Sequence, residues 1–302
     1  MMDVLEVDHL TKTFGATKAV DDVGLRVTEG SIYGFVGENG AGKTTTMRLI
    51  LGLIKPDAGE VRVCGHPVRF GMTRTNRFVG YLPDVPEFYP YMRATEYMRF
   101  CGEVAGLGAS EISRRSGELL EMVGLGQERK KIGAYSRGMK QRLGLAQALI
   151  TRPSLLICDE PTSALDPVGR KEVLEILNLI RAQTTVLFST HILSDVERVC
   201  DRAAVIHKGR IVMDGSLDDL VARHGSRGLR IEFASMDDAT RFRSLVPPWL
   251  ITGQDGEEVI MAGAMESDKL QVIERLATYG ILPVRFESIT PSVETLLLEA
   301  VS

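Results

Sequence analysis

The sequence has no apolar stretch long enough to cross a membrane. A spanning α-helix needs about 20 consecutive apolar residues, and polar or charged residues interrupt the apolar stretches of this chain well before that length. Residues 1–6, Met-Met-Asp-Val-Leu-Glu, lack the basic and then apolar pattern of a secretory signal. We therefore expect the chain to stay in the cytosol.

An excess of basic residues is also missing. The chain has 36 Lys and Arg against 40 Asp and Glu, which gives a net charge of −4 and a pI near 5.8. Such a chain presents no general positive field to the phosphates of nucleic acids or anionic lipids. Binding to either would need a local basic patch, and no nucleic acid partner is expected.

Cysteine is scarce and scattered. The four cysteines show no Cys-x-x-Cys spacing, so the sequence predicts neither a zinc site nor a disulfide framework. The remaining composition, with 44% apolar and 25% charged residues, is typical of a soluble globular protein. A length of 302 residues favours a large core and a smaller second unit.

Apolar periodicity predicts an α/β core within residues 1–223. The expected elements of its first part are strands at residues 4–7, 24–27 and 31–36 and a helix at 44–54. A helical subdomain inserted at about 87–150 is expected to hold helices at 94–107, 111–123 and 139–150. The strand, helix and strand expected at 154–158, 169–183 and 184–188 form a βαβ unit, which is typical of a parallel sheet.

A second domain is expected at residues 229–302, after a linker at 224–228 that is rich in small and polar residues. Its expected elements are a strand at 229–233, a helix at 237–245, a hairpin around 254–256, a helix at 268–279, a strand at 281–286 and a last helix capped by Thr290. This order predicts a small split βαβ sandwich.

Residues 37–44, Gly-Glu-Asn-Gly-Ala-Gly-Lys-Thr, match the phosphate-loop pattern G-x-x-x-x-G-K-[ST]. The match lies between an expected strand and an expected helix, where glycines let backbone N–H groups surround a phosphate and the helix N-terminus adds positive potential. Lys43 is expected to reach the β- and γ-phosphates, the Thr44 hydroxyl to bind Mg²⁺, and Thr45 to add a backbone donor. The loop therefore predicts nucleotide binding.

Two further strands are expected to end in polar side chains at the same edge of the sheet. Asp159 and Glu160 follow the apolar residues 155–158, and His191 follows the next strand. Ligands bind at the carboxyl ends of parallel strands. We expect Asp159 to hold Mg²⁺, Glu160 to activate the attacking water, and His191 to touch the γ-phosphate.

Together, these motifs resemble those of the ATP-binding cassette (ABC) ATPases. Residues 135–142, Tyr-Ser-Arg-Gly-Met-Lys-Gln-Arg, look like the family's signature, residues 163–166 like its D-loop, and residues 189–191 like its switch. The resemblance covers residues 1 to about 220. It implies an α/β P-loop NTPase fold with a RecA-like parallel-sheet subdomain, an inserted helical subdomain and, here, the small C-terminal α/β domain.

The resemblance also implies ATP and Mg²⁺ as cofactors and a homodimer, or a paired ATPase subunit, with each ATP between one phosphate loop and the other subunit's signature. Ser136 and Gly138 are expected to precede the helix at 139–150 and to meet the γ-phosphate across that interface. The expected nucleotide-binding residues are Phe14, Gly37, Glu38, Asn39, Gly40, Ala41, Gly42, Lys43, Thr44, Thr45, Ser136 and Gly138. The expected catalytic residues are Lys43, Glu160 and His191, and the expected metal ligands are Thr44, Asp84 and Asp159.

The sequence departs from the commonest family pattern at several positions. In the signature, Arg137 replaces a glycine and Met139 a glutamine, a variant that looks like that of drug, polysaccharide and sodium exporters. Phe14 stands where the family usually stacks a tyrosine on adenine, and either stacking or simple packing would explain it. Asp84 stands at the position of a glutamine that contacts Mg²⁺, so both a metal-linked role and an ordinary loop role remain open.

The resemblance predicts an ATP-hydrolysing motor of a membrane exporter, peripheral at the cytoplasmic face of the membrane, with a separate integral membrane permease. The aromatic-rich residues 88–100 are expected to form either a docking groove for that permease or an internal subdomain core. Alternatives are a soluble ABC ATPase acting on ribosomes or DNA, and an importer motor. Two cassettes in one chain or long heptad coiled coils would favour the soluble alternative, and the sequence has neither.

Overall fold

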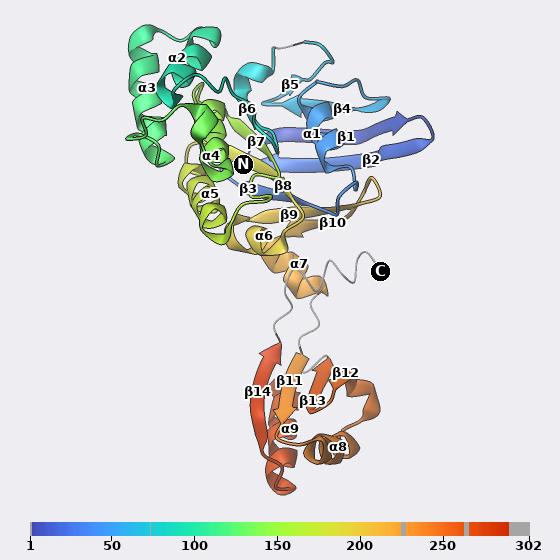
Figure 1. Ribbon diagram of the computed structural model, residues 1–302. Helices are drawn as coiled ribbons and strands as arrows, with labels where there is room; N and C mark the ends of the chain where they lie inside the picture. The colour runs from blue at the N-terminus through green and yellow to red at the C-terminus, as the bar shows by residue number, and fades with distance from the viewer. Residues whose placement is uncertain (1, 73, 225–227, 263–265, 290–302) are drawn as a thin grey trace. The chain divides into compact units, whose positions relative to one another are not determined.

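The computed structural model describes residues 2–72, 74–224, 228–262 and 266–289. The chain divides into two compact units, Met1–Leu217 and Asp218–Ser302 (Figure 1). The last helix expected from the sequence, with Thr290 as its cap, lies outside the described residues.

A largely parallel sheet forms the centre of the first unit. Its strands, in the order β10-β9-β3-β8-β7-β6, are β10 (Arg210–Ser216), β9 (Arg202–His207), β3 (Ile32–Val36), β8 (Thr185–Thr190), β7 (Leu155–Asp159) and β6 (Val79–Leu82). β6, β7, β8, β3 and β9 pair in parallel, and β10 joins β9 antiparallel. The residues of β3, β7 and β8 are buried, as expected of strands covered on both faces.

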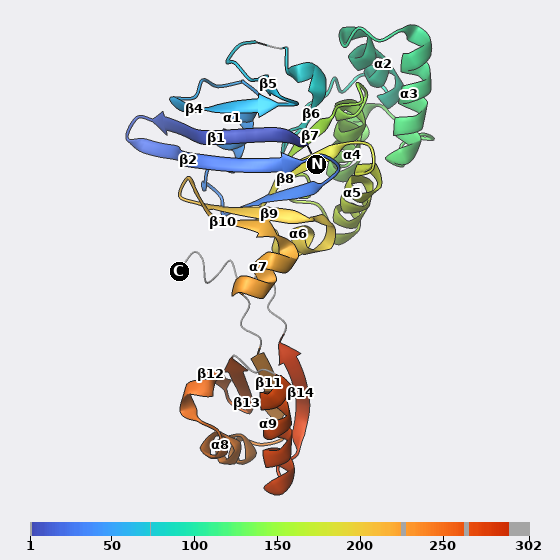
Figure 2. The same ribbon diagram turned by 180° about the vertical axis from the view of Figure 1, so that it is seen from behind.

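A second, antiparallel sheet with the order β2-β1-β4-β5 lies over one face of the parallel sheet (Figures 1 and 2). Its strands are β1 (Asp3–Phe14), β2 (Thr17–Thr28), β4 (Ala58–Val63) and β5 (His66–Pro67). The strands expected at 4–7 and 24–27 are thus parts of one long hairpin, because the polar residues between them continue the antiparallel ladder.

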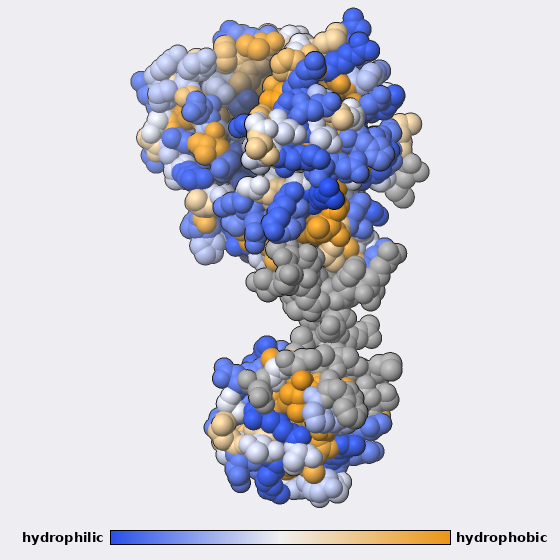
Figure 3. All heavy atoms as spheres, turned by 90° about the vertical axis from the view of Figure 1, so that its right-hand side faces the viewer, coloured by the Kyte–Doolittle hydropathy of each residue, from blue (hydrophilic) through white to orange (hydrophobic). Residues whose placement is uncertain are grey.

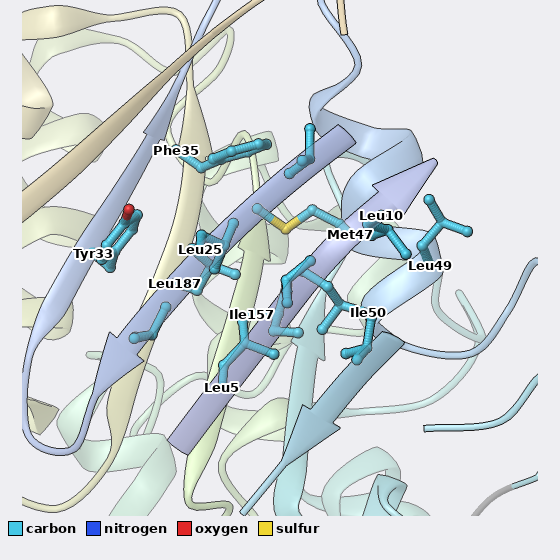
Figure 4. Close-up of a cluster of buried hydrophobic side chains, with 14 of the residues drawn as sticks. Leu5, Leu10, Leu25, Tyr33, Phe35, Met47, Leu49, Ile50, Ile157 and Leu187 are labelled. Carbon is cyan, nitrogen blue, oxygen red and sulfur yellow. The ribbon is translucent and has the colours of Figure 1, made fainter. Parts of the chain in front are cut away.

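Helix α1 (Lys43–Ile50) lies between the two sheets and carries part of their shared core. Figure 4 shows Met47 and Ile50 facing Leu10 of the antiparallel sheet and Ile157 of the parallel sheet. Burying one such side chain contributes about 1.5–3 kcal/mol. Helix α1, which follows the phosphate loop, is therefore fixed in position by the core. The helix ends earlier than the expected Ile54, because Gly52 adopts a positive φ of 66° just after it.

The other helices of the first unit cover the far face of the parallel sheet and form a helical region beside it (Figure 1). The covering helices are α4 (Arg137–Ala148), α5 (Pro167–Ile180) and α6 (Leu193–Val199). The helical region contains α2 (Ala94–Val104) and α3 (Ala109–Met122). A short 3-10 turn, η1 (Asn76–Phe78), precedes β6, and another, η2 (Ile132–Ala134), lies between α3 and α4. Local capping sets several starts: Ser136 accepts the Met139 N–H at the start of α4.

The second unit contains most of helix α7 (Leu217–His224) and then elements in the order β, α, β, β, α, β. These are β11 (Gly228–Phe233), α8 (Met236–Leu245), β12 (Ile251–Asp255), β13 (Glu258–Ala262), α9 (Glu266–Thr278) and β14 (Pro283–Ile289), with the short turn η3 (Pro248–Leu250) before β12. The sheet order β12-β13-β11-β14 matches the expected split βαβ sandwich. Phe233 of β11 contacts Phe242 of α8 with ring centroids 5.2 Å apart inside the core. The expected strand at 281–286 starts two residues later, at Pro283.

The visible surface in Figure 3 is largely hydrophilic, with hydrophobic residues in smaller groups. Among the described residues, no helix combines the length and the apolar character that crossing a membrane requires.

Candidate functional site

The glycine-rich loop follows β3 directly and ends in α1, as the sequence predicts. Gly37 is buried, and a Cβ there would lie 2.4 Å from the Ile206 carbonyl oxygen. Gly42 has a φ of 112°, and its Cβ would lie 2.4 Å from the Ala19 carbonyl oxygen. Because other residue types do not fit at these two positions, the loop can close tightly around a phosphate. Glu38, Asn39 and Gly40 are exposed at its tip.

Lys43 is buried at the base of this loop, with only 5% of its surface exposed. Its Nζ donates hydrogen bonds to the carbonyl oxygens of Gly37 at 2.6 Å and Glu38 at 3.1 Å. The same Nζ lies 3.0 Å from Glu160 Oε1. A buried ammonium group needs such partners, so the loop holds Lys43 with its charge directed into the loop.

The two carboxylates at the end of β7 are held by the neighbouring strand β8. The Ser189 hydroxyl donates to Asp159 Oδ1 at 2.6 Å and accepts the Glu160 N–H at 3.0 Å. Glu160 adopts a positive φ of 50°, an uncommon conformation for a residue with a side chain. Ser189 therefore holds the Asp159 carboxylate and the backbone of Glu160, a role that the sequence analysis did not assign to it.

His191 completes the arrangement around Glu160. Its Nδ1 lies 2.8 Å from Glu160 Oε2, and its side chain is 42% exposed. One carboxylate oxygen of Glu160 therefore faces Lys43 and the other faces His191. The structure thus brings together the three residues that the sequence analysis selected as catalytic.

A buried ion pair ties the segments that follow Glu160 and His191 to each other. Asp195 of α6 is 1% exposed and accepts hydrogen bonds from Thr162 Oγ1 at 2.6 Å and from Arg170 Nε at 2.5 Å. Sequence reasoning missed Asp195 and Arg170. Around Arg170 and Asp195 the sequence shows a helical spacing of apolar residues. This spacing does not reveal that the helices α5 and α6 meet.

The remaining expected nucleotide-binding residues lie on separate elements. Phe14 ends β1, with 51% of its surface exposed and the Lys12 ammonium 5.4 Å from its ring centroid; simple core packing does not account for this exposure. Ser136 is exposed as the N-cap of α4. The expectation that Gly138 precedes the helix is wrong: α4 begins at Arg137, because the Ser136 cap starts the helix two residues earlier.

Asp84 follows β6 and lies beside the signature. Its Oδ1 is 3.5 Å from Arg137 Nη2. Partial burial raises the pKa of the Asp84 carboxyl, the Arg137 charge opposes that shift, and the negative charges of Asp159 and Glu160 add to it. Asp84 thus lies within the electrostatic field of the acidic pair.

The side chains near the loop suit a magnesium ion bound together with phosphates. Asp159 is 2% exposed and Thr44 is partly buried at the start of α1. A carboxylate and a hydroxyl are hard oxygen donors, and Mg²⁺ commonly binds through one or two protein ligands plus substrate phosphates and waters. In the part of the chain that the structure describes, no cluster of three or more His, Cys, Asp or Glu side chains could hold a metal by itself.

The aromatic-rich stretch divides between the two roles that the sequence left open. Tyr97 and Met98 are buried in the helical region, whereas Tyr89 and Tyr91 are 45% and 63% exposed. A cavity of about 480 Å³ lies beside the exposed part. Its lining consists of Asp84, Val85, Pro86, Glu87, Phe88, Pro90, Ile132, Gly133, Arg137, Lys140 and Gln141.

Comparisons with known proteins all match this chain to ABC transporter proteins. A family model described as "ABC transporter" matches residues 20–163. An uncharacterized ABC transporter ATP-binding protein of Bacillus subtilis, YxlF, is 43% identical over 218 residues, 72% of each chain. The bacitracin transport ATP-binding protein BcrA of Bacillus licheniformis is 40% identical over 74% of this chain and 73% of its own. A solved structure of the ATP-binding subunit of an ABC transporter is 34% identical with a TM-score of 0.67, covering 74% of this chain and 93% of that one.

Proposed function

Because the chain belongs to the ABC transporter family, whose ATP-binding subunits hydrolyse ATP to drive transport, we propose that it powers an exporter with a separate permease. The observation that carries the proposal is the Glu160 carboxylate, placed between Lys43 Nζ at 3.0 Å and His191 Nδ1 at 2.8 Å at the mouth of the phosphate loop. The exporter direction is supported by the signature variant and by the name of the relative BcrA, a bacitracin transport protein.

The residues of the loop and the strand ends have distinct roles in this proposal. The backbone of residues 37–45 surrounds the phosphates, and Lys43 exchanges its contact with Glu160 for the β- and γ-phosphate oxygens. Glu160, freed from Lys43, accepts the proton of the attacking water. His191 stabilises the charge that develops on the γ-phosphate. Phe14, an exposed ring at the end of β1, stacks on the adenine.

Mg²⁺ fits beside this arrangement. Thr44 and Asp159 are the residues that would hold it, with Asp84 as a further candidate; the ion would neutralise charge on the phosphates. Ser189 keeps the Asp159 carboxylate in place through its 2.6 Å hydrogen bond, so that the acid does not need to be reoriented when the nucleotide arrives.

ABC ATPase domains dimerise and work with membrane permeases. We propose that two copies, or this chain and a paired ATPase subunit, bind head to tail, with Ser136 and Gly138 at the start of α4 meeting the ATP of the partner. An exposed N-cap hydroxyl and a helix N-terminus suit a phosphate anion.

The permease is proposed to dock in the 480 Å³ cavity beside residues 84–90. Tyr89 and Tyr91, the exposed neighbours in sequence of the lining residue Pro90, are of a residue type that is enriched at protein interfaces. The chain would then be peripheral at the cytoplasmic face of the membrane. Residues 1–223 would form the ATPase domain, with the helical subdomain at about 87–150, and residues 229–302 an accessory domain.

The proposal is tested with a tagged Glu160→Gln variant, which keeps the shape of the side chain but removes the base. The variant is captured from detergent-solubilised host membranes with Mg-ATP, and the co-purified proteins are identified. The doubly substituted Lys43→Ala/Glu160→Gln chain is the matched control, since it lacks the phosphate counter-charge. ATP-dependent recovery of a polytopic membrane protein supports the proposal. Recovery of ribosomal or DNA-bound proteins instead contradicts it, and a solute-binding protein encoded beside the chain favours an importer.

A further inference from the structure

Helix α4 packs against β6 and the residues that follow this strand. A Cβ on Gly80 would lie 2.2 Å from the Ala148 carbonyl oxygen near the end of α4. One turn earlier on the helix, a Cβ on Gly144 would lie 2.5 Å from Leu82 Cδ1. Close packing of this kind transmits displacement rather than absorbing it. β6 and the C-terminal half of α4 therefore move as one rigid body.

The contact continues beyond the strand to the first turn of the helix. The buried Gln141 side chain lies within reach of the Asp84 carbonyl oxygen, with its Nε2 at 3.5 Å. One turn nearer the N-terminus, Arg137 Nη2 lies 3.5 Å from the Asp84 carboxylate. The loop after β6 is thus joined at Asp84 to the turn that Ser136 caps.

Asp84 and Arg137 are two of the positions at which the sequence departs from the common family pattern. The commoner residues there are glutamine and glycine, and a glycine offers no side chain to pair with. In this chain the two departures are each other's charge partners across 3.5 Å.

We propose that the Asp84–Arg137 pair is a positioning contact. It makes the loop at residues 84–90, where the permease is proposed to dock, move together with the signature at residues 135–142. A segment seated in the 480 Å³ cavity touches residues of both sides, since Pro86 and Phe88 line it with Lys140 and Gln141. Displacing the loop then displaces the N-terminus of α4, and with it Ser136. The inference rests on the proposed function, because it assigns the pair a part in presenting the signature to the partner's ATP.

The pair can be altered without unfolding the chain. The side chains of Arg137 and Asp84 are 48% and 46% exposed, and half-exposed ion pairs add little to the free energy of folding. Reversal of one charge, however, places like charges at the same short distance and pushes the loop away from the helix. Exchanging the two charges restores the attraction, so recovery in the double exchange assigns the effect to the pairing, and unchanged melting of the single variants separates it from a loss of stability.

The test measures ATP-induced dimerisation by light scattering in the Glu160→Gln background. Asp84→Arg and Arg137→Asp are each expected to raise the ATP concentration for half-maximal dimerisation by about fivefold or more, within the range of coupled neighbouring sites. The double exchange is expected to return within about twofold of the parent. The same exchange at Arg99 and Glu103, an exposed pair 2.8 Å apart on α2, is the matched control and should change nothing.

The outcomes separate this inference from the proposed function. If the Glu160→Gln parent does not dimerise with Mg-ATP, both fail. If the parent dimerises but the single reversals have no effect, or the double exchange is no better than they are, the pair is not a positioning contact and Asp84 acts by another route. Thermal melting checks that each variant is folded. If a reversal prevents folding, Asp84→Asn, Arg137→Gln and their double form a double-mutant cycle: the double should lose no more than either single variant, and additive losses would overturn the pairing.

Discussion

Asp195 is the residue whose removal tests most directly how the two catalytic strand ends are held together. In the structure its carboxylate is 1% exposed and accepts hydrogen bonds from Thr162 and Arg170. Thr162 stands two residues after Glu160, and Asp195 stands four residues after His191. We expect Asp195→Ala both to lower stability and to reduce turnover.

The expected size of the stability loss follows from the partners left behind. Thr162 is 1% exposed, and a buried hydroxyl donor without an acceptor costs about 1–3 kcal/mol. Breaking a buried ion pair costs about 3–5 kcal/mol, but the Arg170 side chain is 30% exposed and regains water. The total should therefore be about 3 kcal/mol, near the lower end of that range. At about 2–4 °C per kcal/mol for a domain of this size, Tm should fall by roughly 6–12 °C.

The assay is thermal unfolding together with steady-state ATPase kinetics of purified protein. Asp195→Asn is the matched variant, since its single acceptor oxygen can serve Thr162 or Arg170 but not both, and it should lose less stability than Asp195→Ala. In a double-mutant cycle with Arg170→Ala, the two substitutions should cost less together than their sum by about 0.5–3 kcal/mol. A Tm within about 2 °C of the wild type for Asp195→Ala would refute the reasoning, as would additive effects of the two substitutions.

Three further variants probe the nucleotide site. Phe14→Ala should weaken ATP binding by about 1–3 kcal/mol, the value of one base–aromatic stack, and leave Tm unchanged because the ring is 51% exposed; calorimetric titration with ATP checks the first and melting the second. Gly42→Ala forces a side chain to within 2.4 Å of the Ala19 carbonyl oxygen, so it should lower stability by at least about 1–3 kcal/mol and abolish ATP binding in the same titration. Lys43→Ala should weaken ATP binding by at least tenfold, since each charged hydrogen bond contributes about 1.5–3 kcal/mol; unchanged affinity would exclude the contact with the phosphates.

The sequence predicts well those features whose physical cause is local. The glycines of residues 37–42 fix the phosphate loop because their backbone conformation excludes side chains, and the apolar strand before Asp159 fixes the position of the acid. The helical region and the split βαβ order follow from periodicity in the same way. Such features need no knowledge of distant neighbours.

Features that depend on distant contacts were beyond sequence reasoning. Nothing local to Ser189 indicates that its hydroxyl holds the Asp159 carboxylate and the Glu160 backbone at the end of the adjacent strand. The hairpin of β1 and β2 is longer than its apolar alternation suggests, because cross-strand hydrogen bonds extend it through polar residues. The partnership of Asp84 with Arg137 joins positions 53 residues apart. In the sequence, Asp84 and Arg137 are two separate departures from the common family pattern, and only the fold places them side by side.

In the proposed function, the contacts of Glu160 with Lys43 and His191 link nucleotide binding and water activation in one subunit. Its carboxylate lies 3.0 Å from Lys43 Nζ and 2.8 Å from His191 Nδ1, so without phosphate its charge is already satisfied. A triphosphate competes for Lys43 with more negative charge than one carboxylate carries, and the lysine that Glu160 loses is the one the phosphates gain. Glu160 then regains an unpaired oxygen only when ATP is in place. On the proposed function, the base therefore becomes available to a water when there is a γ-phosphate to attack, which limits proton abstraction in the empty site.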